Sequence, residues 1–139
     1  MRAITNYLNW ALREMGRYVE ARDLAQTTLD RQRQVLGKDH PETLITASSL
    51  ATSLRELGEV KAARHLDHDT LNRRRRVLGE IHPDTLRSAR HLANDRRKLG
   101  DVQAARDMDQ DTLDRYRRVL GEDHPDALYS AYNLAADLR

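Results

Sequence analysis

Three histidines with the same spacing are the first candidates for chemistry, because imidazole is the commonest metal ligand in proteins. His40, His82 and His124 lie 42 residues apart, and each precedes a proline. A zinc ion holds its ligands at about 2.0 to 2.3 Å, whereas equivalent residues on packed helices lie on the order of 10 Å apart. We therefore predict no metal site. The expected role is structural: Asp39 or His40 caps a helix that begins at Pro41.

Residues for covalent or phosphoryl chemistry are missing from the sequence. The chain has no cysteine, which excludes thiol nucleophiles, disulfides and zinc-thiolate sites. It has no glycine-rich phosphate loop and no serine in a nucleophile elbow. Asp123 and His124 do stand side by side, but neighbours at a helix entry do not converge on a substrate without a pocket. We predict that the protein is not an enzyme and needs no cofactor.

An arginine run at residues 73–76 could bind the phosphates of a nucleic acid or a membrane. The run falls in the last turns of a predicted helix, where the macrodipole favours cations. Asp69 precedes Arg73 by four residues, and Asp111 and Arg115 repeat this stabilising arrangement. We therefore expect a solvated, salt-bridged convex face. Nucleic-acid binding through these helix ends is the disfavoured alternative, since the formal net charge is only +2.

The composition favours a thin core over a single thick one. Charged residues make up 33% of the chain and hydrophobic residues 39%, with no phenylalanine and one tryptophan. A core shared between stacked helices suits this composition. No run of about 18 apolar residues could span a membrane, and the N-terminus lacks the apolar segment of a signal peptide. We expect a cytoplasmic protein with no membrane partner.

The sequence repeats itself with a period of 42 residues, and this period decides the architecture. Residues 37–78 and 79–120 are identical at 24 of 42 positions. Within residues 42–57, apolar side chains recur at spacings of three and four, as on one face of a helix. Gly58 follows, where that helix would end. Applied to the whole chain, the pattern predicts about seven helices, at residues 3–15, 19–36, 42–57, 60–78, 84–99, 102–120 and 126–138.

One unit carries Leu50, Ala51, Leu54, Gly58 and Ala63, a pattern that resembles the tetratricopeptide repeat. The longer period and the Leu-Gly-x-x-His-Pro connector are similar to the 42-residue subtype of kinesin light chains. The sequence of residues 111–113 and 117–126 resembles repeats of actinobacterial nucleotide-binding signalling ATPases of the NB-ARC/STAND type. The resemblance implies an all-α fold, a right-handed α-solenoid of antiparallel helix pairs. It implies one array, with units at 1–36, 37–78, 79–120 and a partial unit at 121–139.

Charged residues occupy positions that tetratricopeptide repeats usually keep apolar. Asp67 and Asp109 stand where the second helix ordinarily carries an aromatic residue, and Ala25 is their equivalent in the first unit. Arg96 replaces a leucine of the first helix. Because a buried unpaired charge is costly, we predict that Arg96 pairs with Asp67 or Asp109 between packed helices. The alternative is a partly wet helix end, where a pair would contribute little.

The last predicted helix, residues 126–138, has no second helix to pack on. It presents an apolar stripe made of Leu128, Ala131, Leu134, Ala135 and Leu138. Since a terminal repeat needs a polar outer face for solubility, we expect the chain to be a fragment of a longer array, with this stripe covered by another chain. Self-association through the C-terminal helix is the favoured outcome.

The resemblance also implies that the first helix of each unit lines a concave groove that binds protein or peptide. The positions expected to face this groove are polar, basic or aromatic: Trp10, Arg13, Ser48, Thr52, Arg55, Arg87, Arg90, His91, Asn94, Arg97, Tyr129, Tyr132 and Asn133. Arginine and asparagine can hold carboxylates in fixed geometry, and aromatic residues supply buried area. We hypothesise capture of an acidic or C-terminal peptide around Arg87, Arg90, Asn94 and Arg97. In the alternative, these residues only keep the groove of a scaffold soluble.

The sequence thus predicts a non-enzymatic repeat scaffold that binds a protein or peptide. By the resemblance, the alternative is a sensor or regulatory segment of a larger signalling ATPase. The catalytic part of such a protein would lie outside these 139 residues.

Overall fold

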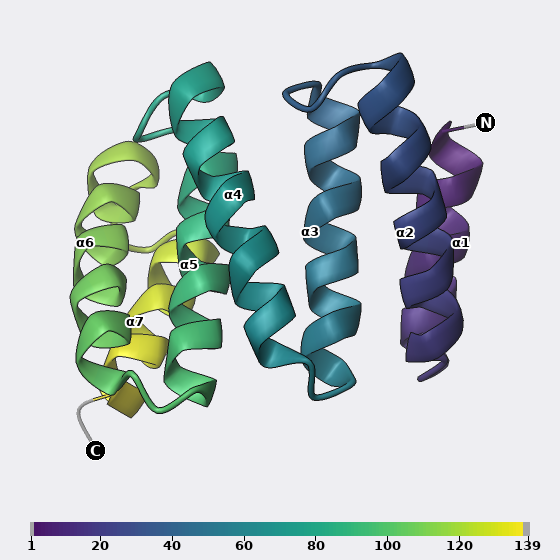
Figure 1. Ribbon diagram of the computed structural model, residues 1–139. Helices are drawn as coiled ribbons and strands as arrows, with labels where there is room; N and C mark the ends of the chain where they lie inside the picture. The colour runs from purple at the N-terminus through teal and green to yellow at the C-terminus, as the bar shows by residue number, and fades with distance from the viewer. Residues whose placement is uncertain (1, 138–139) are drawn as a thin grey trace. The chain divides into compact units, whose positions relative to one another are not determined.

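The computed structural model describes the backbone of residues 2–137 and the side chains of residues 5–136, and within that span it consists of helices joined by short turns (Figure 1). The helices are α1 (Arg2–Glu14), α2 (Tyr18–Val35), α3 (Pro41–Glu56), α4 (Val60–Leu78), α5 (Pro83–Lys98), α6 (Val102–Leu120) and α7 (Pro125–Asp137). Each begins and ends within one residue of the predicted position, so the prediction of an all-α chain is confirmed. Leu138 of the predicted apolar stripe lies outside the described residues.

The turn between α3 and α4 shows why glycine recurs along the sequence. Gly58 has a φ of +84°, in the left-handed region that residues with a Cβ rarely adopt. Its N–H donates to the Arg55 carbonyl at 3.1 Å, and the N–H of Glu59 donates to the Leu54 carbonyl at 2.8 Å. These two bonds close the end of α3 as a Schellman motif. An added Cβ would meet no atom within 4 Å, so the backbone conformation, and not crowding, requires glycine.

Three first helices begin with a histidine cap. The Nδ1 atoms of His40, His82 and His124 accept a hydrogen bond from the backbone N–H two residues on, at 3.1, 3.0 and 3.1 Å. A proline follows each histidine and takes the first helical position, where its missing N–H costs nothing. Of the two caps that the sequence allows for α3, the structure selects His40. Because each Nδ1 accepts, the proton of the neutral ring lies on Nε2.

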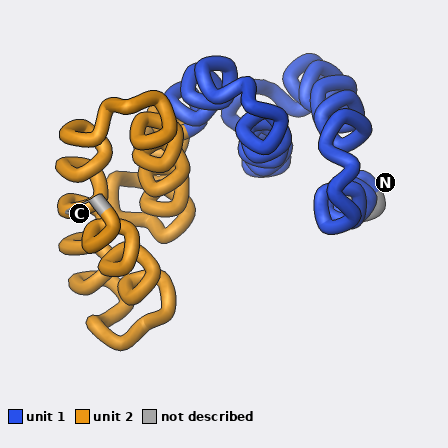
Figure 2. Tube along the Cα trace, turned by 90° about the horizontal axis from the view of Figure 1, so that it is seen from below, with its two compact units in different colours: residues 1–70 blue, residues 71–139 orange. Residues whose placement is uncertain are grey.

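The chain folds as two compact units, residues 1–70 and 71–139 (Figure 2). In the first unit, α2 packs against α1 and α3. Its core comprises Ala25, Leu29, Ala47 and Leu50, with Leu54 and Leu66 packed against them. The α4 helix contributes residues to both units. The core of the first unit is therefore a layer of mainly small and medium aliphatic side chains, as its composition predicts.

In the second unit, α6 packs against α5 and α7. Two small clusters form its core: Leu71, Ala89 and Leu92 with Met108, and Leu86, Tyr116 and Ala127 with Leu120. Val77, in the last turn of α4, is exposed although it is apolar.

Replacing His82 with alanine removes the cap of α5 and should lower the free energy of unfolding by about 1 kcal/mol, the usual effect of losing a capping side chain. His82→Asn is the matched control, because an asparagine side chain can accept the same backbone N–H and should keep most of the stability. Urea unfolding followed by circular dichroism measures both variants. Equal stability of His82→Ala and the wild type would contradict a stabilising cap.

Candidate binding surface and buried ion pairs

Two arginine-aspartate pairs join first and second helices. Nη2 of Arg55 on α3 lies 2.7 Å from Oδ2 of Asp67 on α4, and these side chains are only 6% and 2% exposed. One period later, Arg97 on α5 forms the same pair with Asp109 on α6. Each arginine stands in the last turn of its helix and each aspartate lies inside the following helix. The pairs therefore tie antiparallel neighbours together from within.

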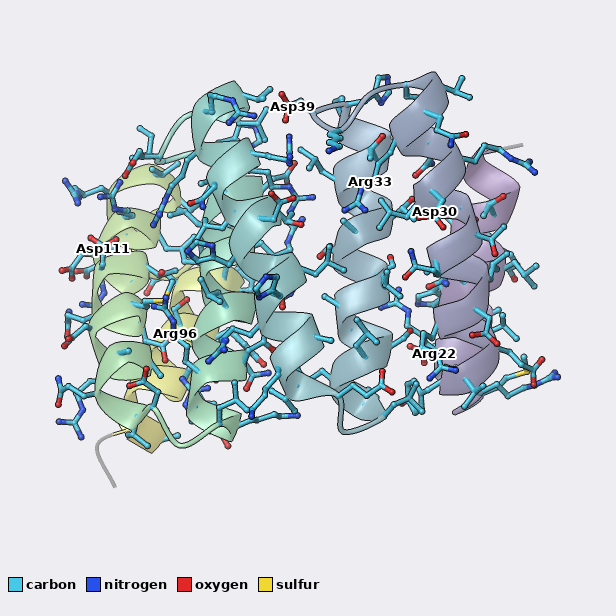
Figure 3. The ribbon with its side chains drawn as sticks, viewed as in Figure 1. Arg22, Asp30, Arg33, Asp39, Arg96 and Asp111 are labelled. Carbon is cyan, nitrogen blue, oxygen red and sulfur yellow. The ribbon has the colours of Figure 1, made fainter. Side chains whose placement is uncertain are left out.

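The predicted pairing of Arg96 with Asp67 or Asp109 is wrong. Nη1 of Arg96 lies 2.9 Å from Sδ of Met108, so its side chain reaches α6 at a different point (Figure 3). Arg97 holds Asp109, and Arg55 holds Asp67. Consecutive residues of a helix point in directions about 100° apart, and the arginine that faces the aspartate is the neighbour of the predicted one. The wet alternative also fails, because both carboxylates are buried.

Two arginines that the sequence pattern placed in contact with solvent are buried. Arg55, expected to face the groove, belongs to the interior through its pair with Asp67. Arg74, expected on a solvated face, is also buried, and its Nη1 donates to Ser88 Oγ at 2.9 Å and to the Asp84 carbonyl at 3.3 Å. The run at residues 73–76 is therefore not a continuous cationic surface, which further disfavours phosphate binding by this run.

The rest of the predicted salt-bridged face is present on α6. Nε of Arg115 lies 2.9 Å from Oδ2 of Asp111, as the spacing of four residues predicts. Nη1 of Arg115 also lies 3.2 Å from Oε2 of Glu80. Asp111 is seen on the outer side of α6 in Figure 3. Pairs of this exposed kind contribute well under 1 kcal/mol each, so they keep the face soluble and add little stability.

In the first unit, the predicted surface residues of α1 and α3 divide into an aromatic and a hydroxyl group. Trp10 is half exposed, and its ring centroid lies 5.8 Å from that of Tyr7, a residue outside the predicted set. Ser48 and Thr52 on α3 are half-buried, with Thr52 Oγ1 donating to the Ser48 carbonyl at 3.1 Å. Tyr7 could have been found from its spacing of three residues before Trp10, which places both rings on one helix face.

In the second unit, an arginine and two tyrosines form a mixed patch on α5 and α7. Cζ of Arg90 lies 4.6 Å from the centroid of the Tyr129 ring, within the range of a cation-π interaction. Nη1 of Arg90 is also 3.9 Å from Oδ1 of Asp126. Tyr129 and Tyr132 are 53% and 69% exposed. Two large aromatic side chains are thus left in solvent next to a cation that is already oriented.

The arginines expected to capture a ligand carboxylate already have partners within the protein. Nη1 of Arg87 lies 3.0 Å from Oδ1 of Asp84. Besides its pair with Asp109, Arg97 donates from Nη1 to Asn94 Oδ1 at 3.3 Å. His91 and Asn133, the remaining residues of the predicted set, are half-buried. A ligand would have to compete with these contacts. The competition is weakest at Arg87, because its ion pair with Asp84 is exposed.

Burial shifts the pKa of one phenol in the second unit. Tyr116 is fully buried, and this burial raises the pKa of its hydroxyl, an effect that Arg90 partly offsets and Asp126 reinforces. The ring packs with Leu86 and Ala127 in the core. Tyr116 therefore stays neutral at physiological pH and serves packing between α5, α6 and α7.

The described residues offer neither a metal site nor a membrane span. Among them, no group of three or more histidine, aspartate or glutamate side chains is placed to hold a metal ion. None of the described helices is long and apolar enough to cross a membrane. What the surface does offer is aromatic rings, hydroxyls and oriented guanidinium groups on first helices.

Comparison with known families identifies the repeat. Residues 10–76 match one family model, and residues 85–126 match a second, each described as tetratricopeptide repeat. This chain is built of tetratricopeptide repeats. Such repeats are scaffolds typical of protein-protein interaction. Among functionally curated proteins, no sequence matches the chain.

Solved structures agree with the fold. Two crystal structures of a candidate kinesin light chain from Podosopora anserina with nearly identical TPR-like repeats, one of them of a variant form, are each 25% identical to this chain with a TM-score of 0.91. Those alignments cover 97% of this chain and 64% of that chain. BtubC (BKLC) from P. vanneervenii is 19% identical, with a TM-score of 0.88 over 98% of this chain and 54% of that one. The chain thus spans less than two thirds of these neighbours, and they confirm the predicted solenoid class.

Replacing Asp67 with alanine leaves the buried guanidinium of Arg55 without its carboxylate and should lower the free energy of unfolding by about 3 to 5 kcal/mol. The double variant Arg55→Met/Asp67→Leu removes both charges, so it should recover most of that loss. Guanidinium chloride unfolding of the single and double variants measures the difference. A double variant no more stable than Asp67→Ala would show that the pair itself, and not the orphaned charge, dominates.

Proposed function

We propose that this chain is a non-enzymatic scaffold that binds a protein or peptide through its first helices, α1, α3, α5 and α7. The tetratricopeptide repeats support the general role. The more specific assignment to first helices draws support from their exposed residues, since Trp10 lies on α1 and Tyr129 and Tyr132 lie on α7. Most of the exposed ring area of the described chain therefore belongs to helices of this class.

The observation that carries the proposal is the patch of Arg90, Tyr129 and Tyr132 in the second unit. Interface hot spots are enriched in tyrosine, tryptophan and arginine, because these side chains bury much area while losing little conformational freedom. Stacking on Tyr129 holds the Arg90 guanidinium in place before any ligand arrives. Such preorganisation lowers the entropy lost on binding.

An acidic or C-terminal peptide remains the proposed ligand class. The exposed pair of Arg87 with Asp84 is held weakly in water, so a ligand carboxylate can replace Asp84 at little cost. Arg97 is less suited than its neighbours, because releasing it would leave the buried Asp109 uncompensated. We therefore assign the acidic contact of the second unit to Arg87 and Arg90.

The double variant Tyr129→Ala/Tyr132→Ala should weaken binding of the cognate peptide at least tenfold without unfolding the protein, because both rings are exposed. Peptides selected from a phage-displayed random library on the wild-type protein provide the ligands, and fluorescence polarisation measures their affinity. Val119→Ala, at an exposed apolar position of α6, is the matched control and should bind as tightly as the wild type. Unchanged affinity of the tyrosine variant, or a library that yields no binder, would reject the proposal.

The resemblance of the connector sequences supports one narrower version of this role, that of a sensor or regulatory segment in a signalling ATPase. The support comes from residues 117–126, whose sequence resembles repeats in such proteins. In that case a nucleotide-binding module is encoded in the same open reading frame. Sequencing the complete reading frame decides between this version and a separate adaptor.

Self-association through α7 is the second role that a specific observation favours. Leu44 and Leu86 occupy the same repeat position and are 4% and 2% exposed, whereas their equivalent on α7, Leu128, is 57% exposed. The face of α7 that inner first helices bury is therefore open. The first unit also carries an open groove of about 330 Å³ beside α2, lined in part by Leu24, Val35 and Leu36.

If a second copy covers α7, sedimentation equilibrium at high protein concentration should give an average mass above that of the monomer. Leu128→Glu places a charge on the open face and should return the mass to that of the monomer, since a desolvated unpaired carboxylate opposes association. Leu8→Glu, at another exposed leucine, is the control and should leave the mass unchanged. A monomeric wild-type protein at all concentrations would exclude self-association.

A further inference from the structure

The first unit lacks one half of the ion pair that the later repeats contain. The arginines at positions 13, 55 and 97 are equivalent in the 42-residue period, and so are positions 25, 67 and 109. Arg55 and Arg97 have Asp67 and Asp109 as partners. In the first repeat, the position opposite Arg13 is Ala25, which has no charge and no polar side-chain atom.

Arg13 consequently has an incompletely satisfied guanidinium. The group is half-buried, and its Nε is enclosed with no hydrogen-bond partner. Within the part of the chain that the structure describes, the side chain of Arg13 forms no hydrogen bond or ion pair. Burial lowers the pKa of the Arg13 guanidinium, while Glu14 and Tyr18 act in the opposite direction. The folded protein therefore holds a partly desolvated cation that an added negative charge would stabilise.

A compensating substitution accompanies the missing aspartate but supplies no charge. Asn9 stands where the later repeats have Ala51 and Ala93, so the polar group has moved from the second helix to the first. Asn9 is 4% exposed, and its Nδ2 donates to the Ala21 carbonyl at 2.8 Å. Its Oδ1 accepts no hydrogen bond from the described residues. Asn9 and Ala25 border a small cavity of about 10 Å³, the size of one water molecule.

We propose that Arg13 binds a carboxylate of the partner, an aspartate or glutamate side chain of a peptide, in the role that Asp67 and Asp109 fill within the later repeats. The two internal pairs serve as the model for this contact, because the same arginine position selects a carboxylate twice in the same chain. Arg13 is reached from solvent, unlike Arg55. Trp10, one turn earlier on α1 and half exposed, provides an apolar surface for the residues that flank the acidic one.

The inference rests on the proposed function and names the ligand group that the first unit accepts. It also separates Arg13 from the arginines of the second unit. Arg87, Arg90 and Arg97 must exchange an internal carboxylate for that of the ligand. Arg13 gains a partner without giving one up, so the acidic group contributes more binding energy at Arg13 than at these three.

Sodium acetate is the probe for the carboxylate site, titrated against sodium chloride at constant ionic strength. The Nε–H resonances of the arginines are followed by proton-nitrogen NMR, and the Arg13 signal is assigned by its loss in Arg13→Lys. The expected result is a saturable, acetate-specific shift of the Arg13 signal. Arg55 and Arg97 are controls within the same molecule, since their guanidinium groups already hold carboxylates and should respond less. A response of Arg13 no larger than theirs would overturn the proposal.

A designed variant provides an independent outcome. Asn9→Ala/Ala25→Asp gives the first repeat the residues that the second and third repeats have, so the internal carboxylate should occupy Arg13 and abolish its response to acetate. Asn9→Ala/Ala25→Asn is the uncharged control and should respond like the wild type. A persistent acetate response in the aspartate variant counts against the proposal. The comparison of Arg13 with Arg55 in the wild type holds even if a variant fails to fold.

Library-selected peptides distinguish this inference from the proposed function. Peptides that contain Asp or Glu should bind Arg13→Met and the aspartate variant at least tenfold more weakly than the wild type, and those lacking both residues should not be enriched. Peptides that bind all three proteins equally would leave the scaffold function intact and overturn the role of Arg13. An acetate response at Arg13 without any peptide binder would support the carboxylate site at Arg13 and count against the proposed scaffold function.

Discussion

The ion pair between an arginine at the end of an inner first helix and a buried aspartate of the next helix is the interaction on which the repeat depends. A guanidinium cannot lose its charge at physiological pH, so a buried one needs hydrogen-bond acceptors, and a carboxylate supplies both an acceptor and the opposite charge. Arg55 and Asp67 form such a pair between α3 and α4, in a unit whose core consists of alanine and leucine side chains. The pair fixes where the second helix lies along the first, because sliding one helix by a turn would separate the charges. In a thin core, this ion pair sets the relative position of the two helices, a role that large aromatic side chains fill in thicker cores.

The sequence predicted the helices well because periodicity and turn chemistry act locally. Gly58 and its equivalents end helices for reasons confined to a few residues, and the prolines after His40 and His82 begin them for similarly local reasons. Side-chain partners were predicted less well. Choosing between Arg96 and Arg97 as the partner of Asp109 requires the rotation of α5 about its axis to within one residue, and apolar spacing does not define it that closely. Membership of the tetratricopeptide family predicts the arrangement of the helices, but it does not predict the rotation of α5 about its axis.

On the candidate surface, too, some side chains lie where the sequence predicts and others do not. The exposed tyrosines of α7 and Trp10 of α1 were selected from repeat position alone, because an aromatic residue off the apolar stripe has to face solvent or a partner. The same rule predicts that Arg55 faces the groove, but Arg55 is buried and its guanidinium pairs with Asp67. Repeat position thus predicts that the rigid rings of Trp10, Tyr129 and Tyr132 are exposed. The position of a flexible charged side chain depends on its ion-pair partner. That partner lies on another helix, and the repeat pattern of the sequence does not identify it.

The histidine caps give the three connectors a shared chemical dependence. Each Nδ1 accepts a backbone N–H at the positive end of a helix. Three helices therefore begin on the same kind of acceptor, at equivalent places in the 42-residue period. A property that is local at each turn thereby becomes collective along the chain. Repetition, which gives the molecule its regularity, also makes the start of three helices depend on one kind of side chain.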